Sequence, residues 1–491
     1  MICAAKIVAS TTVTVWEREV GEVLNLSGRK IRAACLGALL VCLLLGGVLA
    51  ALTAAQLTTQ LPVELRTSIL GTSFGSVVMT TGLVSMILCL SSPAGNALQT
   101  LLDMLPVART AAYLGQHAPL MIMGFVFSLT LSSTAMVVAW QVAPGIPAAL
   151  GSLVLVLIVI VIWQLLSVAL FSVVSHYLGS MLRLPLQYRN SIAAAAVIAA
   201  SLGSAATDVF SFTPRDSDSF TPLDLLLNRV AADVSTTPTQ WTSWLLLLGW
   251  ATLAAVLMVL AASRYNVGAA AGFPRFFQGW LPSAGLRSAL VWFEILVAIR
   301  NPQIIVTTLA AVPLLIASLW SASIPQLSSV SFAMASAIPV VPALNGLYAV
   351  GRTLPTRWVT TQISASATAW ITPKLAANFL VCMLLSSLMM LVVLASSLIT
   401  VTDIPSISAR VLAALFMALL AGTLIPYSIS QPLSTAAGGF ILGILFLLSS
   451  VTTSFLGGLI GTSAVPFISL AFAALFAAGF FLLTTKEFSS S

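Results

Sequence analysis

The sequence contains very few charged residues. Only 7% of its 491 residues are Asp, Glu, Lys or Arg, while 59% are hydrophobic, and the mean hydropathy is +1.08. A soluble domain of this length needs more charge on its surface, because charged side chains keep a folded protein in solution. Continuous apolar runs recur instead, at about the 17–25 residues that an α-helix needs to cross a bilayer. The composition therefore predicts an all-α, polytopic membrane protein.

Motifs for catalysis and nucleotide binding are also missing. The chain has no G-x-x-x-x-G-K-[ST] phosphate loop and no C-x-x-C pair, and its polar loops hold no paired carboxylates or metal-ligand cluster. We therefore expect this chain to be no enzyme and to hold no cofactor of its own. If ATP energises it, the ATPase is a separate subunit.

One catalytic motif occurs in an unsuitable context. Gly71-Thr72-Ser73-Phe74-Gly75 matches the G-x-S-x-G nucleophile elbow, but it begins an apolar run with no strand before it. The same residues form a Gly-x-x-x-Gly pattern that lets two membrane helices approach closely, as do Gly439 and Gly443. We interpret both patterns as helix-packing motifs.

The net charge of +7 would suggest nucleic-acid binding in a soluble protein. Here most Lys and Arg residues flank apolar runs, where they set membrane topology. If the N-terminus is cytoplasmic, most of these Lys and Arg residues fall on cytoplasmic loops. The charge pattern thus predicts a multi-pass protein of the cell membrane with both termini in the cytoplasm, and no nucleic-acid partner.

The apolar runs predict about twelve spans in two halves of six. The first half is residues 1–270, with spans Ala33–Leu52, Ser68–Leu90, Pro119–Trp140, Leu150–Phe171, Ile192–Ala206 and Trp244–Ala262. The second half is residues 271–491, with spans Ile304–Trp320, Ser331–Val350, Lys374–Ala395, Val411–Tyr427, Ala436–Val451 and Val465–Leu483. The fifth run is short and rich in Ala and Ser, which predicts a re-entrant or tightly packed helix. Residues 207–242 form an acidic external loop, and residues 287–300 an interfacial helix before the seventh span.

Two landmarks occur in the same order in both halves. Glu22 and Arg29 precede the first span as Glu294 and Arg300 precede the seventh, and Leu105-Pro106 follows the second span as Leu354-Pro355 follows the eighth. Arg109 and Arg357 lie just after these Leu-Pro pairs. The matching order predicts a duplicated unit, which is a common plan among transporters.

The two Leu-Pro loops allow two interpretations. In the first, the loops are docking sites through which a partner protein moves the membrane helices. Pro would make the beginning of each loop rigid, and Arg would bind in an acidic cleft of the partner. Alternatively, the Arg residues only set topology and the Pro residues only begin helices.

Polar side chains inside the predicted spans are rare. We find no Asp or Glu within any of them, which argues against an intrinsic proton relay. The eighth span carries Pro339, Pro342 and Asn345, so it either lines a transport pathway or is a kinked packing helix. Gln164 in the fourth span is either an interhelical hydrogen bond or a pathway residue.

The chain resembles, over its whole length in topology, the membrane subunits of ABC transporters, in the exporter class with the type V fold. The resemblance rests on Glu294-Ile-Leu and Arg300-Asn301-Pro302, on Gly351-Arg352-Thr353-Leu354-Pro355, and on Lys374 at the start of the ninth span. It implies amphipathic connecting helices, cytoplasmic coupling helices that dock on an ATPase, and a polar external insertion such as 207–242. The second half has no counterpart of that insertion.

Carried onto this sequence, the resemblance implies two sets of residues. The ATPase-coupling loops would contain Leu105, Pro106, Arg109, Leu354, Pro355 and Arg357, and the connecting helices Glu22, Arg29, Glu294 and Arg300. Many family members carry one six-span half and dimerise, whereas this chain carries two. One chain would then pair with two ATPase subunits, which would hold the ATP and Mg²⁺.

The expected function is therefore the export of a small amphipathic compound, such as a drug, antibiotic, peptide or lipid, by an ATP-driven permease. The alternative is a secondary transporter driven by an ion gradient, which the missing intramembrane acids disfavour. A membrane enzyme or scaffold for lipid-linked substrates is a third interpretation, disfavoured by the absence of paired carboxylates.

Overall fold

The computed structural model describes most of the chain. The described residues are 2–24, 28–30, 33, 36–37, 40, 63–91, 108–143, 145–209, 222–264, 285–322, 328–363, 367–427 and 433–489. They are helical almost throughout and contain no β-strand, as the composition predicts. The chain divides into two compact units, Met1–Ala271 and Gly272–Ser491.

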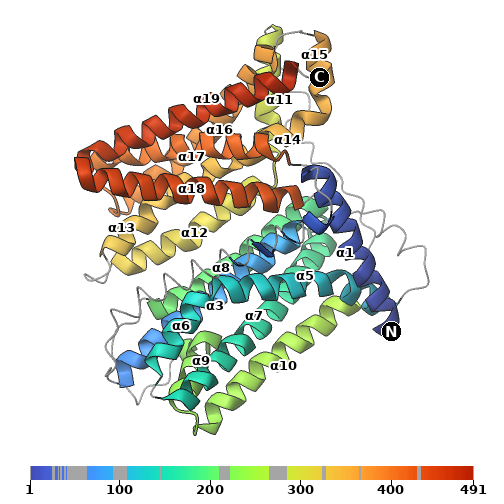
Figure 1. The fold of residues 1–491 in the computed structure, drawn as a ribbon, viewed down its shortest axis with the longest axis vertical. Coiled ribbons are helices and arrows are strands. Elements are labelled where there is room, and N and C mark those ends of the chain that lie inside the picture. The colour runs from blue at the N-terminus through green and yellow to red at the C-terminus, as the bar shows by residue number, and fades with distance from the viewer. Residues whose placement is uncertain are drawn as a thin grey trace. The chain divides into compact units, whose positions relative to one another are not determined.

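The helices of the first unit lie side by side, apart from α1, which crosses their ends (Figure 1). They are α1 (Ile2–Leu24), α3 (Val63–Ser91), α5 (Arg109–Leu131), α6 (Ser133–Val142), α7 (Ile146–Met181), α8 (Leu186–Val209), the 3₁₀ turn η1 (Pro222–Leu225), α9 (Leu227–Thr236) and α10 (Trp241–Ser263). The longest, α7, has 36 residues and begins with Pro in its first turn, where the missing N–H has no helical acceptor in any case.

The second unit is also a bundle of long helices. Its elements are α11 (Leu286–Ile299), α12 (Gln303–Ala322), α13 (Ser328–Ala337), η3 (Ile338–Tyr348), α14 (Ala349–Thr353), η4 (Leu354–Thr356), α15 (Arg357–Ile363), α16 (Ala367–Ala395), η5 (Val401–Asp403), α17 (Ile404–Leu424), α18 (Leu433–Ile460), η6 (Thr462–Ala464) and α19 (Val465–Ser489). In Figure 1, α11 and α15 lie together at one end of this bundle.

Within the described residues, nine helices are long and apolar enough to cross a membrane. A tenth span exists if the pair Ser288–Ile299 and Gln303–Leu319, bent by 60°, counts as one. The first predicted span, Ala33–Leu52, lies almost entirely outside the described residues. The protein is therefore a multi-pass α-helical membrane protein, and these segments account for nine of the predicted spans, or for ten with the bent pair.

The third and fifth predicted spans differ in detail from the structure. The third helix begins at Arg109 rather than Pro119, because membrane helices accommodate an internal Pro. It also breaks at Ser132, between α5 and α6. The fifth, α8, is one 24-residue helix; it is long enough to span a bilayer but is not among the nine candidate spans. It is tightly packed, since Ala193 and Ala194 are fully buried.

Small residues bring α3 and α8 together in the first unit. A Cβ added at Gly75 would lie 3.3 Å from the backbone of Ala205, and one at Gly82 would overlap Ser201. The Gly-x-x-x-Gly pattern that contains Gly75 thus lies at a close helix contact. Gly439 and Gly443 were expected to do the same, but a Cβ at either would meet nothing within 4 Å, so that interpretation is wrong for contacts inside the second unit.

The predicted eighth span contains an irregular stretch. Residues Ile338–Tyr348 form an 11-residue 3₁₀ helix, far longer than the usual three or four residues. Pro339 and Pro342 each lack the N–H that a regular α-helix would use. Both prolines are buried, and η3 packs between α12, α16 and α17.

The two units share a pattern of helix contacts. In the first, α3 contacts α5 and α7, and α7 contacts α8 and α10; in the second, η3 contacts α16 and α17, and α17 contacts α18 and α19. In both units, the helix that precedes the first span of the unit also packs on the helix of its third span. This contact is α1 with α5 in the first unit and α11 with α16 in the second. Several corresponding spans therefore meet corresponding partners within each unit. The extensive contact between α3 and α8 has no counterpart of similar extent between η3 and α18 among the described residues.

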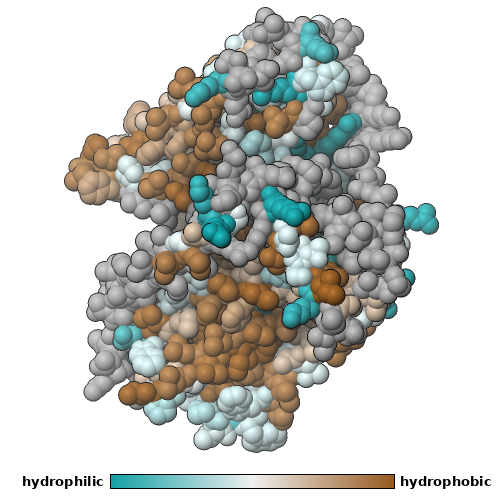
Figure 2. Space-filling model, turned by 45° about the vertical axis from the view of Figure 1, so that its right-hand side comes forward, coloured by the Kyte–Doolittle hydropathy of each residue, from teal (hydrophilic) through white to brown (hydrophobic). Residues whose placement is uncertain are grey.

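Large hydrophobic areas occur on the face of the described residues that Figure 2 shows. On α10, for example, Leu245, Leu248, Val256 and Val259 are all exposed. An apolar area of this extent is unstable in water and is normal where a helix faces lipid.

Candidate functional site

The most unusual polar feature of the second unit is a buried ion pair between α11 and α16. The Lys374 ammonium lies 2.7 Å from Oε1 of Glu294. The lysine is completely buried, and the glutamate is 6% exposed. Charged groups are costly inside a membrane protein, and those that persist there are paired and commonly functional.

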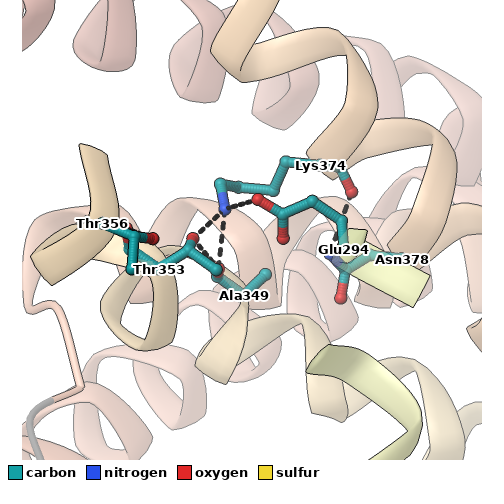
Figure 3. A network of polar contacts seen from close by, with 6 residues as sticks. All are labelled: Glu294, Ala349, Thr353, Thr356, Lys374 and Asn378. Carbon is teal, nitrogen blue, oxygen red and sulfur yellow. Dashed lines mark hydrogen bonds and ion pairs between the residues drawn. The ribbon is translucent and has the colours of Figure 1, made fainter. Parts of the chain in front are cut away.

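Two further acceptors complete the surroundings of the ammonium (Figure 3). Lys374 also donates to the backbone oxygen of Ala349, at 3.1 Å, and to the hydroxyl of Thr353. A lysine ammonium has three N–H groups, so all three have acceptors. The ring of Trp370 lies 4.7 Å from the same nitrogen, near enough for a cation–π contact.

This arrangement binds three segments to one charge. Glu294 belongs to α11, Ala349 and Thr353 to α14, and Lys374 to α16. With every donor used, the ammonium has no N–H left for a substrate and no lone pair to act as a base. The site is suited to holding helices in register rather than to chemical catalysis.

A small cavity with a mixed polar and apolar lining adjoins the ion pair. Its volume is about 10 Å³, and its polar lining residues are Glu294, Asn301, Asn345, Tyr348, Arg352 and Asn378. These come from α11, the turn after it, η3, α14 and α16. A cavity of this size is at the lower limit for a single water molecule.

Aromatic rings and two arginines surround the end of α14. Arg352 lies 5.9 Å from the ring of Tyr427 and donates to the backbone oxygen of Val297 at 3.4 Å. Burial raises the pKa of the Tyr427 phenol, and the Arg352 charge opposes that shift. Arg357 lies 5.6 Å from the ring of Trp370. Both arginines therefore pack on aromatic faces of their own unit.

The predicted coupling residues of the second half lie at this end of the bundle. Leu354 and Pro355 form the 3₁₀ turn η4, and Arg357 begins α15. Leu354 and the neighbouring Trp358 are exposed. Arg300 ends α11 as its C-cap residue. The structure thus places this loop against α16 and directly after Thr353, a partner of the ion pair.

The corresponding residues of the first half are described only in part. Leu105 and Pro106 lie outside the described residues. Arg109 is exposed at the first position of α5, and Arg29 is exposed as well. Glu22 lies in the last turn of α1.

The predicted pathway residues are buried in their units. Pro339, Pro342 and Asn345 lie on η3, where Asn345 donates to the hydroxyl of Thr307 at 2.9 Å. Gln164 of α7 donates to the backbone oxygen of Met121 in α5 at 2.7 Å. The interhelical hydrogen bond considered for Gln164 is therefore present.

The sequence interpretation missed the Glu294–Lys374 pair. From the sequence, Glu294 is expected on an interfacial helix and Lys374 at the first position of the ninth span, and nothing in that expectation pairs them. In the structure Glu294 lies in the first arm of the bent pair, with its side chain buried, and Lys374 lies inside the candidate span Ala367–Ala395. A signal was available: a lysine between Trp370 and Asn378, in a largely apolar run, is too costly to occur without a partner.

Comparisons of the chain with protein-family models, with curated proteins and with solved structures find no match.

Proposed function

We propose that this protein is the permease subunit of an ATP-driven ABC exporter in the cell membrane, with both termini in the cytoplasm. It would move a small amphipathic compound, such as a drug, antibiotic, peptide or lipid, and would be energised by two separate ATPase subunits that hold ATP and Mg²⁺. The chain's own role is to provide the membrane pathway and the surfaces on which the ATPases act.

The observation that supports this proposal best is the position of the ion pair beside the loop 354–363. Thr353, whose hydroxyl accepts from Lys374, is the last residue before that loop. A force on the loop would therefore reach α11 and α16 through a rigid, fully hydrogen-bonded contact. Such a connection is what a coupling loop needs in order to move helices.

The repeated helix contacts support the same proposal. In each unit the preceding helix packs on the third-span helix, and the second-span helix packs on the third and fourth. Two similar units can move against each other as rigid bodies, which is the usual basis of alternating access in duplicated transporters. ATP-driven closure of two partners would drive that movement.

The test is affinity purification from the native cell in mild detergent, followed by an ATPase assay of the eluate. We expect a soluble ATPase to co-purify, and the double variant Arg109→Glu/Arg357→Glu to lose it. Arg410→Glu is the control, because Arg410 is exposed and lies in the second turn of α17, outside both predicted coupling loops. Size-exclusion profiles would verify that each variant remains folded. Purification of the chain alone, without ATP-dependent activity, would contradict the proposal.

A second candidate function is transport driven by an ion gradient. The sequence argument against it was the absence of acids in the spans, and the buried Glu294 weakens that argument because proton-coupled carriers use such groups. Reconstitution into proteoliposomes separates the two candidates. Uptake that follows an imposed proton or sodium gradient without ATP would favour the secondary transporter.

A further inference from the structure

The carboxamide of Asn345 has one polar atom without a partner. Its nitrogen donates to the hydroxyl of Thr307 at 2.9 Å and to the backbone oxygen of Pro342 at 3.1 Å, whereas its oxygen, Oδ1, is buried and accepts no hydrogen bond. Asn345 is 6% exposed and lines the cavity beside Glu294. Buried polar atoms almost always have partners, so an unpartnered one next to a cavity indicates an occupant.

The orientation of this carboxamide is fixed by its neighbours. The Pro342 carbonyl can only accept, and the Thr307 hydroxyl already donates to the backbone of its own helix. The atom that faces both must therefore be the nitrogen of Asn345. The alternative orientation, with nitrogen and oxygen exchanged, would set two acceptors against an acceptor. The unpartnered atom is consequently an oxygen, and its missing partner is a donor.

The charges around the cavity restrict that donor to a neutral group. Arg352 lines the cavity and the Lys374 ammonium offsets the charge of the Glu294 carboxylate, so the remaining positive charge would repel a cation. An anion would face the Glu294 carboxylate and the unpartnered oxygen of Asn345. The volume of about 10 Å³ admits no more than one hydroxyl or amide group.

We propose that this cavity is a binding site for one neutral hydrogen-bond donor, a hydroxyl or an amide N–H, which bonds to Oδ1 of Asn345. The group comes either from a resident water or from the polar end of an amphipathic molecule in the membrane. The site does not depend on an ATPase partner, so it stands or falls separately from the permease function.

The direct test is a structure of the purified full chain in lipid nanodiscs, at a resolution that shows ordered water. We expect density within hydrogen-bonding distance of Oδ1 of Asn345. Compact density would identify a resident water, and elongated density that continues out of the cavity would identify an amphipathic molecule. A clearly empty cavity would overturn the proposal, and this test needs no variant.

A binding measurement tests the chemical class of the occupant. The thermal midpoint of the nanodisc-embedded chain would be recorded with octanamide, 1-octanol, octylammonium and octanoate. If an amphipathic molecule is the occupant, only octanamide and 1-octanol should raise the midpoint, and Asn345→Leu should abolish the shift. Thr423→Val, a buried residue of α17 bonded within its own helix, should retain it. If water is the occupant, none of the four should bind here. Selective stabilisation by octylammonium or octanoate that Asn345→Leu abolishes would overturn the proposal.

Discussion

Lys374 and Glu294 are 80 residues apart in the sequence, yet their charged groups lie 2.7 Å apart in the interior of the second unit. Their contact ties α11, which precedes the bundle, to α16, a span within it. The hydroxyl of Thr353 joins the same ammonium, so the end of the preceding span is included. The pair is thus a junction of three segments beside an exposed loop.

Removing either charge alone should strongly destabilise the protein. Lys374→Met leaves the Glu294 carboxylate unpaired, and Glu294→Gln leaves the ammonium with no opposite charge. Each should cost about 3–5 kcal/mol, the usual range for breaking a buried pair. Thermal unfolding in nanodiscs, followed by tryptophan fluorescence, would measure the loss.

The double variant Glu294→Gln/Lys374→Met is the informative control for that prediction. Since it leaves no unpaired charge, it should lose less stability than the two single variants added together. If the losses simply add, the two side chains do not interact in the membrane, and their role as a junction is wrong.

The sequence allowed the helical class and most spans to be predicted, because length and hydropathy are local properties. It did not reveal the Glu294–Lys374 pair, because that contact depends on how α11 packs against α16. The break between α5 and α6 was also missed, since Ser132 is not flanked by Gly or Pro. At Pro339 and Pro342 the sequence did suggest an irregular helix, because a missing N–H acts locally.

Gly351 should tolerate no side chain. A Cβ at this position would overlap the backbone of Tyr427, and backbone atoms cannot move aside as a flexible side chain can. Gly351→Ala should therefore cost roughly 1–3 kcal/mol, as overpacking usually does. Gly439→Ala is the matched control, because its Cβ would meet nothing within 4 Å. That change should be neutral or stabilise α18 by up to about 1 kcal/mol. Equal thermal midpoints for the two variants would refute this account.

Gln164 should contribute modestly through its bond to α5. Gln164→Leu keeps most of the side-chain volume and removes the 2.7 Å bond to the Met121 carbonyl. Interhelical hydrogen bonds in membranes are worth about 0.6–2 kcal/mol, so we expect a loss in that range. Gln164→Glu should cost more, since it buries a carboxylate. If Gln164→Leu lost more stability than Gln164→Glu, the site would be open to water or to a cation. Transport measured on Gln164→Leu would then test the pathway role separately.

The buried Asn228 should hold α9 against α8. Its side chain is fully buried, accepts from the hydroxyl of Ser204 at 2.8 Å and donates to the backbone oxygen of the same residue at 3.0 Å. Asn228→Ala leaves both groups of Ser204 without this partner, which should cost about 1–3 kcal/mol. Hydrogen exchange of the α9 amides should accelerate, while that of the central turns of α7 should not.

Thr236→Val is the control for that measurement, because Thr236 bonds only within the turns of its own helix. It should leave the exchange of α9 nearly unchanged. Ser204→Ala combined with Asn228→Ala should add little to the effect of Asn228→Ala, because residues that share one pair of bonds are not independent. Acceleration spread evenly over all helices would instead mean that Asn228 stabilises the unit as a whole, and that α9 has no separate attachment to α8.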